Sequence, residues 1–276
     1  MSNKVIITAA ISGAEVTQEM NPAVPYTIED YVREAKGAYE AGAAIIHLHA
    51  RFDDGTPTQD RERFRVIIDA IQEACPDVII QPSTGGATGM TADERLQPTE
   101  LNPEMASLDC GTMNFGGDEI FVNTENMIIE FAARMNERGI KPELECFDKS
   151  HVDMALRLVR RGHIEPPLHF NFVLGVNGGA TGTPRDLLFL KESIPADATF
   201  TVTGVGRCQL DMNVMGMVLG GHVRVGFEDN LKYDRERLGA SNAEFVERIV
   251  RIAKELNKEI ATPAEAREIL HLPARA

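Results

Sequence analysis

The chain has 276 residues, 43% of them hydrophobic, and a formal net charge of −14 at pH 7. This is enough for one large domain or two small ones with a full core. The acidic balance argues against nucleic acid or an anionic membrane surface as the main partner, because both attract positive patches. Four widely spaced cysteines without a CxxC motif indicate reduced thiols. The first apolar run, VIITAAI, is too short for a signal peptide or a membrane span. We therefore expect a cytoplasmic protein.

Short apolar runs rich in β-branched residues recur along the whole chain. They are continuous rather than alternating, as expected of parallel strands that are buried on both faces. The sequence predicts eight strands, at residues 5–11, 45–50, 78–84, 105–111, 141–148, 168–175, 199–206 and 222–228.

Segments with helical periodicity lie between these runs. One begins with Thr27 as a predicted N-cap and Asp30 three residues later, and it ends at Gly42. Apolar residues at three- and four-residue steps predict further helices at 60–74, 123–139 and 241–257. Strands that alternate with helices eight times predict an α/β protein with a (β/α)8 TIM barrel.

We expect a single TIM-barrel domain over residues 1–276, with a C-terminal helical extension at about 259–276. Because TIM barrels carry their active sites at the C-terminal ends of the strands, these ends are where chemistry is expected. Polar, charged and glycine residues converge there: Ser12, Gly13, Glu15, His47, His49, Arg51, Ser83, Thr84, Gly85, Gly86, Ser107, Asp109, Glu145, Asn177, Gly178, Gly179, Arg207, Arg224, Glu228 and Asp229.

His47 and His49 are two residues apart in a predicted strand, so their side chains point to the same face. Together with Glu228 at the end of the last strand they form two imidazoles and one carboxylate, a set used by catalytic zinc sites that keep a position open. The HxH spacing alone is a weak signal, since both residues could be ordinary core or loop histidines. Their position at strand ends favours a metal site.

Long motifs in the same order make the chain resemble the β-keto acid cleavage enzymes. They are ITAAISGAE, AGAAIIHLHAR, IIQPSTGGATG, PEMASLDCGTMNFG, KPELECFD, HFNFVLGVNGG, GGHVRVGFEDN and IATPAEAREIL, and they span nearly the whole chain. The resemblance implies a zinc-dependent acyltransferase. Such an enzyme converts a β-keto acid and acetyl-CoA into acetoacetate and the CoA ester of the shortened acid. It also implies a homo-oligomer, taken here as a tetramer.

By this resemblance the zinc ligands fall on His47, His49 and Glu228, where zinc would polarise the keto oxygen. The family's catalytic arginine and aspartate fall on Arg224 and Asp229. The guanidinium would orient the carboxylate and keep it ionised until it removes the C2 proton.

The resemblance also implies how the substrate is held. Ser83 and the backbone amides of Gly85 and Gly86 would bind its carboxylate, with Ser107 standing where the family often has threonine. The alternative for the glycines is a tight turn that requires positive φ.

Glu15 and Glu145 are the acidic positions associated with a cationic substrate tail, so a keto acid with an amino group is favoured. Asp109 replaces an expected asparagine. It would strengthen this preference if it faces the pocket, or pair with a neighbouring helix if it does not.

The sequence leaves three questions open. The CoA nucleotide is expected to meet one or more of Arg51, Arg185 and Arg207. The apolar positions of ATPAEAREILHL suit either an interface between subunits or packing within one subunit. Finally, the same barrel could serve a metal-dependent aldolase or hydrolase without CoA, or a non-catalytic metal- or metabolite-binding protein.

Overall fold

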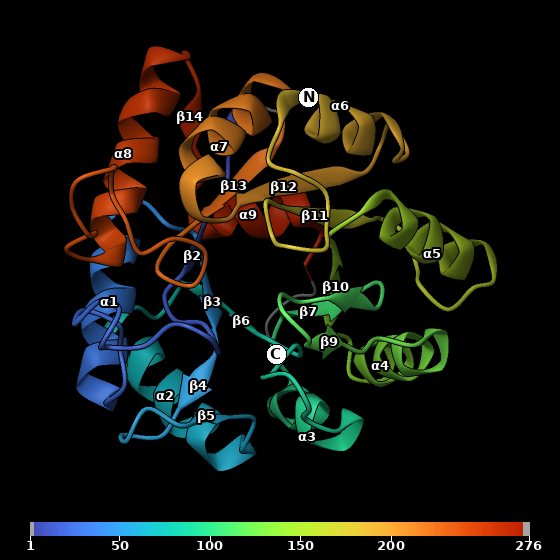
Figure 1. Cartoon of the computed structure of the whole chain (residues 1–276), viewed down its shortest axis with the longest axis horizontal. Helices are drawn as coiled ribbons and strands as arrows, with labels where there is room; N and C mark the ends of the chain where they lie inside the picture. Colours follow the sequence, from blue (N-terminus) through green and yellow to red (C-terminus); the bar gives the residue numbers. More distant parts are fainter. Residues whose placement is uncertain (1–2, 273–276) are drawn as a thin grey trace.

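The computed structural model describes residues 3–272, and these form a TIM barrel with helices around it (Figure 1). All eight predicted strands are present and parallel. They are β2 (Ile7–Ala10), β3 (Ile45–Leu48), β6 (Ile79–Pro82), β7 (Met105–Asp109), β10 (Lys141–Cys146), β11 (His169–Leu174), β12 (Thr199–Gly204) and β13 (His222–Val225). Most end a few residues before the predicted limit, because the chain leaves the sheet there to form the loops that carry the candidate site.

The hydrogen-bonded strand order is β6-β3-β2-β13-β12-β11-β10-β7, so the barrel has a seam between β6 and β7. Ser83 donates its N–H to Leu48 O in β3, at 2.9 Å. The backbone N–H and C=O groups of the residues before and after it therefore point towards β7. One of them is Pro82, which has no N–H to donate. The other, Thr84, donates its N–H to Ser107 Oγ at 3.1 Å and its hydroxyl to Ser107 O at 2.7 Å. Side-chain hydrogen bonds thus replace the ladder at the seam.

The helices cover the outside of the barrel (Figure 1). The described residues form α1 (Ile28–Ala41), α2 (Arg61–Ala74), α3 (Ala92–Leu96), α4 (Glu125–Glu137), α5 (Lys149–Arg160), α6 (Pro184–Glu192), α7 (Gln209–Val218), α8 (Asn242–Glu255) and α9 (Pro263–Leu270). The predicted limits of α1 are confirmed: Thr27 and Asp30 form a capping box, and Gly42 ends the helix at φ +121°.

Short elements complete the loops. They are β4 (Ala50–Arg51), β5 (Pro57–Thr58), β8 (Met113–Asn114), β9 (Ile120–Phe121), and the 3₁₀ turns η1 (Gln97–Leu101) and η2 (Gly206–Cys208). β1 (Lys4–Val5) pairs in parallel with β14 (Glu259–Ile260), which places a strand where the sequence predicts the start of a helical extension.

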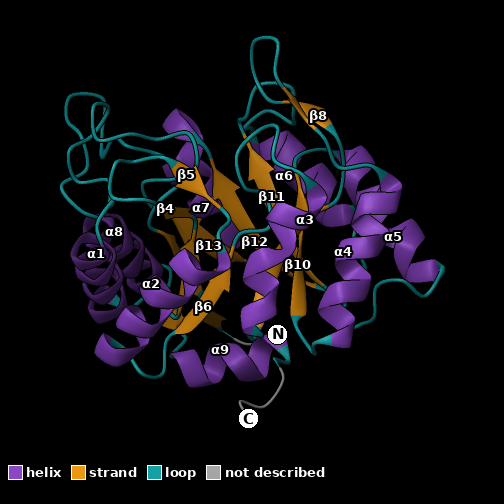
Figure 2. Ribbon diagram, turned by 90° about the horizontal axis from the view of Figure 1, so that it is seen from below, coloured by secondary structure: helices purple, strands orange, loops and turns teal. Residues whose placement is uncertain are grey.

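Helix α9 closes the end of the barrel opposite the loops that follow the strands (Figure 2). Its buried residues Ala266 and Leu270 share an apolar cluster with Ile6, Ile45 and Met105 from the barrel interior. The apolar positions of the C-terminal segment are therefore used within one subunit, the second of the two alternatives. Residues 273–276 of the predicted extension lie outside the described part of the chain.

The barrel interior is polar from its middle to the C-terminal ends of the strands. The strand register places Thr8, Gln81, Glu143 and Thr201, all buried, in one layer contributed by alternate strands. The next layer towards the loops holds His47, Ser107, Asn171 and Arg224. Barrel interiors are usually filled with Val, Ile and Leu, and burying polar groups is costly unless they are paired. Such a core indicates a site that extends deep into the barrel.

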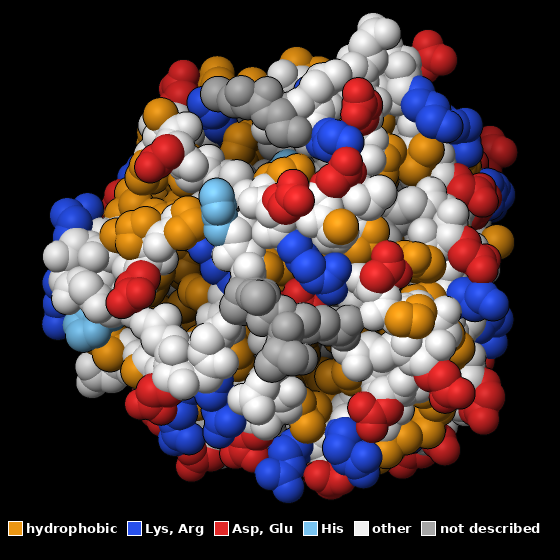
Figure 3. Space-filling view, turned by 180° about the vertical axis from the view of Figure 1, so that it is seen from behind, with side chains coloured by type: hydrophobic (Ala, Val, Ile, Leu, Met, Phe, Trp, Pro, Cys, Tyr) orange, Lys and Arg blue, Asp and Glu red, His pale blue; other side chains and the backbone are white. Residues whose placement is uncertain are grey.

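The face of the molecule seen from behind gives no comparable signal. Acidic and basic side chains are intermixed over the face seen from behind (Figure 3). Within residues 3–272, no helix combines the length and the apolar character needed to cross a membrane.

Candidate active site

A cavity of about 480 Å³ opens at the C-terminal ends of the strands. It is lined by all twelve residues for which a catalytic, metal-binding or substrate-binding role is predicted: Glu15, His47, His49, Ser83, Gly85, Gly86, Ser107, Asp109, Glu145, Arg224, Glu228 and Asp229. Of the other strand-end residues, Gly13 and Asn177 line it, whereas Ser12, Arg51, Thr84, Gly178, Gly179 and Arg207 do not. The convergence inferred from strand ends is thus present in three dimensions, although the role of each residue remains a prediction.

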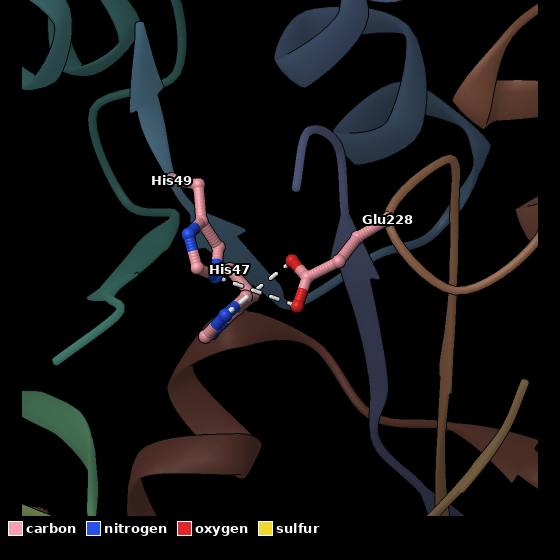
Figure 4. A group of neighbouring side chains, drawn as sticks. All are labelled: His47, His49 and Glu228. Atoms are coloured by element: carbon pink, nitrogen blue, oxygen red, sulfur yellow. Dashed lines mark ion pairs between the residues drawn. The ribbon is translucent and has the colours of Figure 1, made fainter. Parts of the chain in front are cut away.

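His47, His49 and Glu228 face one another across the cavity floor (Figure 4). One ligand atom from each residue lies within 4.8 Å of the others. The two imidazole Nε2 atoms are each 3.5 Å from a carboxylate oxygen of Glu228. Gly13 makes room for this carboxylate, because a Cβ at that position would come within 2.8 Å of Glu228 Cγ.

The protonation states of His47 and Glu228 suit a cation. Burial lowers the pKa of His47 to about 4, so its imidazole is neutral at neutral pH. Burial opposes ionisation of Glu228, but the charge on Arg224 and the two nearby imidazoles hold its pKa far below the usual range. Glu228 Oε2 is buried without a hydrogen-bond partner in the described chain. Neutral imidazoles and an ionised carboxylate are the forms that bind metal ions.

Arg224 lies at the centre of the charged groups. Its Nε donates to Asp229 Oδ2 at 3.0 Å and its Nη2 to Asp229 Oδ1 at 2.8 Å, a bidentate pair. It also donates to Glu228 Oε1, and its Nη1 is 3.6 Å from Glu145 Oε2. Burial raises the pKa of Asp229 to about 6, against the opposing effect of Arg224. Asp229 is therefore mostly ionised at neutral pH and able to accept a proton.

The two acids predicted to meet a cationic tail differ in environment. Glu145 is buried, and this burial raises its pKa well above the ordinary value, with Arg224 only partly offsetting the effect. Glu15 is exposed at the mouth of the cavity, on the loop that follows β2. Glu145 thus lies deep in the cavity and favours its neutral, protonated form, whereas Glu15 lies at the solvent-exposed mouth.

Arg51 is not available for CoA, and this candidate from the sequence was wrong. Its side chain is buried, and the guanidinium donates to the carbonyl oxygens of Gly13, Ala14, Val16 and Gly55. These bonds hold the loop that carries Glu15. The other two candidates, Arg185 and Arg207, are exposed.

Asp109 lines the cavity, but it is paired at the same time with a buried arginine. Arg95, on α3, donates from Nη2 to Asp109 Oδ2 at 3.2 Å and to Asn123 Oδ1 at 2.7 Å. The Arg95 guanidinium lies over the rings of Phe121 and Phe131, at 4.9 and 5.1 Å from their centroids. Both alternatives for Asp109 therefore hold in part, since it faces the cavity and pairs with a helix. Sequence reasoning missed Arg95, which carries no pattern that marks it as buried.

The glycine-rich turn after β6 makes a hydrogen bond within itself. Gly85 donates its N–H to Ser83 Oγ at 3.0 Å, and Gly86 has φ +65°, so the tight-turn alternative applies to Gly86. Ser107 Oγ accepts from Thr84, as described for the seam, and keeps its own proton for a further hydrogen bond.

Residues 4–272 match the family model described as beta-keto acid cleavage enzyme. The chain belongs to the β-keto acid cleavage enzyme family. It is 66% identical to "3-keto-5-aminohexanoate cleavage enzyme" of Acetoanaerobium sticklandii, over 97% of this chain and 98% of that protein. It is 38% identical to "3-oxoadipate:acetyl-CoA acetyltransferase" of Cupriavidus necator, over 99% of this chain and 97% of that one. The predicted family, and the prediction that the chain is an enzyme, are confirmed.

Among solved structures, the apo structure of ObcA superposes with a TM-score of 0.81. The alignment covers 92% of this chain and 66% of that chain, at 21% sequence identity. At this identity the likeness supports the barrel fold and nothing finer.

Proposed function

We propose that this β-keto acid cleavage enzyme uses zinc and acetyl-CoA to cleave a β-keto acid that carries a cationic group. The products would be acetoacetate and the CoA ester of the shortened acid. The observation that carries the proposal is the position of the His47, His49 and Glu228 cluster beside the Arg224 and Asp229 pair in one cavity. Acetyl-CoA is part of the name of the 38% identical relative.

The residues present fit a zinc ion. Two imidazole nitrogens and one carboxylate are a donor set used by catalytic zinc sites. Glu228 Oε2, buried and without a hydrogen-bond partner among described residues, is an acceptor that a cation would satisfy. When bound, zinc would supply a Lewis acid that polarises the keto oxygen and acidifies C2.

Asp229 would accept the C2 proton, and Arg224 would keep its carboxylate oriented towards the substrate. The C2 carbanion then forms a bond to the thioester carbonyl carbon of acetyl-CoA and displaces CoA as a thiolate. That thiolate would attack C3, the bond between C2 and C3 would break, and the proton held by Asp229 would return to C2 to give acetoacetate. Atoms balance, because acetoacetate receives the acetyl group and C1 and C2 of the keto acid, whereas the remaining acyl group leaves as its CoA ester.

The cationic preference is supported by two carboxylates and one relative. Glu145 lies deep in the cavity and Glu15 at its mouth. Glu15 would repel a second carboxylate on the substrate, whereas an ammonium group would be attracted by Glu15 and would favour the ionised form of Glu145. The 66% identical relative is named for a keto acid with an amino group, and the 38% identical one for a dicarboxylate.

A substrate panel tests the proposal. With zinc and acetyl-CoA held constant, kcat/KM is measured for 3-keto-5-aminohexanoate, a quaternary-ammonium keto acid, neutral 3-keto acids of similar length, and 3-oxoadipate. We expect the cationic substrates to react fastest. The highest kcat/KM with 3-oxoadipate would reject the roles of Glu15 and Glu145. Equal cleavage without acetyl-CoA would favour an aldolase or hydrolase, and no cleavage of any acid would favour a binding protein.

We further infer a homotetramer, a single domain over residues 1–276 and a cytoplasmic location. The assembly rests on the family alone, since α9 packs inside its own subunit. Light scattering at micromolar concentration tests it, and a monomer would reject it. The four cysteines are free thiols, and three of them are buried, which suits a reducing compartment.

A further inference from the structure

The layer of polar side chains directly beneath the histidine cluster has no part in the chemistry described so far. Gln81 and Glu143 lie in this layer on alternate strands, and both are buried. Each has one side-chain atom without a hydrogen-bond partner among residues 3–272, Nε2 of Gln81 and Oε1 of Glu143. Unpaired buried polar atoms are uncommon in native proteins and require an explanation.

Gln81 contacts the first histidine of the cluster. Its Oε1 is 2.8 Å from Nδ1 of His47. A carbonyl oxygen only accepts hydrogen bonds, so Nδ1 must carry the proton. In a neutral imidazole this leaves the lone pair on Nε2, the nitrogen that faces Glu228. Gln81 thus presents His47 in the tautomer that a metal ion on Nε2 requires.

The orientation of the Gln81 amide decides this tautomer, because an amide turned by 180° would place its NH₂ group against Nδ1. Glu143 supplies the preference. Its Oε2 is 3.2 Å from Nε2 of His169, and its free Oε1 lies in the same layer as Gln81. A carboxylate attracts the NH₂ end of an amide and repels the carbonyl end, so the Gln81 carbonyl turns away from Glu143 and towards His47.

We propose that Gln81 and Glu143 are positioning residues: the charge of Glu143 orients the Gln81 amide, and Gln81 holds His47 protonated on Nδ1, with Nε2 free for the metal. The inference deepens the proposed function, since the benefit of this tautomer is metal binding. The tautomer itself is a property of the metal-free protein and can be measured without zinc or substrate.

The first test is nitrogen NMR of the zinc-free protein labelled with ¹⁵N-histidine, at neutral pH. The signal of His47 is assigned by its loss in His47→Asn. We expect wild type and Gln81→Glu, which keeps an acceptor, to show the proton on Nδ1. Gln81→Met should move it to Nε2, where Glu228 can accept it. Glu143→Gln should give a mixture of the two His47 tautomers, because without the carboxylate neither orientation of the Gln81 amide is preferred.

Gln97→Met is the matched control, because Gln97 accepts a hydrogen bond from the Arg61 N–H and lies outside the barrel interior. It should leave the tautomer unchanged. A proton on Nε2 of His47 in the wild type, or an unchanged signal in Gln81→Met, would overturn the proposal. Circular dichroism verifies that each variant is folded before its spectrum is interpreted.

The second test is zinc affinity, measured by competition with a chelating dye. Loss of a group that orients a ligand commonly weakens metal binding by roughly 10 to 100-fold. We expect a loss of that order in Gln81→Met, a smaller loss in Glu143→Gln, and none in Gln97→Met. Equal affinity in all variants would contradict the inference. If the tautomers are as expected but wild type binds no zinc, the positioning stands and the proposed zinc function fails.

Discussion

Arg224 holds both carboxylate oxygens of Asp229, with Nε 3.0 Å from Oδ2 and Nη2 2.8 Å from Oδ1. The two residues stand at the end of β13 and in the loop after it, five positions apart, so a local segment builds the pair. A bidentate contact fixes the plane of the carboxylate as well as its position. It thereby fixes, in the lining of the cavity, a carboxylate whose pKa burial raises to about 6.

Replacing Asp229 by asparagine keeps the shape of the side chain but removes its ability to accept a proton. We expect kcat to fall by roughly 100 to 10,000-fold, the usual range for a lost general base, while bound zinc stays near the wild-type amount. Turnover under conditions where proton abstraction limits the rate, together with metal analysis, provides the measurement. Unchanged turnover would assign the base elsewhere.

The activity should depend on pH through the same group. The pKa of Asp229 is raised to about 6, so its carboxylate is the base above this pH and becomes protonated below it. We expect kcat/KM to decrease as the pH falls through about 6 and to level off above it. Since Asp229 interacts with Glu228, the midpoint belongs to the coupled groups rather than to Asp229 alone. A flat profile between pH 5 and 8 would contradict this role.

The metal cluster predicts a loss of zinc on substitution. His47→Ala, His49→Ala or Glu228→Ala should each remove most of the bound zinc and nearly all activity, because each deletes a ligand. Metal content per chain is measured by mass spectrometry. His163→Ala serves as the control, since His163 lies outside the cavity lining. A double variant that retains stoichiometric zinc would disprove the assignment.

Binding of a cationic substrate should release a proton. Burial raises the pKa of Glu145 well above its ordinary value, and a nearby ammonium group would favour the ionised form. Calorimetric titration in buffers with different ionisation enthalpies measures the number of protons released. We expect release in the wild type and its loss in Glu145→Gln. Proton uptake, or equal release in both proteins, would argue against contact between Glu145 and the cation.

The seam of the barrel predicts an effect on stability. Thr84→Val preserves the shape of the side chain but leaves Ser107 O without its hydrogen bond from the Thr84 hydroxyl, which lies at 2.7 Å and is buried. An unsatisfied buried acceptor costs about 1–3 kcal/mol of unfolding free energy. Urea unfolding gives this value. Thr56→Val, at an exposed turn, is the matched control and should change stability little.

Much of the architecture could be predicted from the sequence, because strand and helix signals depend on local periodicity. Continuous apolar runs place all eight strands, and the capping residues of α1 locate both of its ends. The catalytic end of the barrel follows from strand direction alone. The twelve candidate site residues could therefore be named, since each lies at or just after a strand and all of them line the cavity.

The tertiary structure decided what each buried group meets. The sequence presents Arg51 as a cation available for a ligand. In the structure its guanidinium instead donates hydrogen bonds to backbone carbonyls of a loop more than 30 residues away. Asp109 has its charge balanced by Arg95, from a helix that precedes it. Gln81 and Glu143 stand two residues before Ser83 and Glu145 on the same inward faces, so strand alternation could have placed them in the barrel. Their alignment in one layer depends on the register of eight strands, a property of long-range pairing that local sequence patterns do not encode.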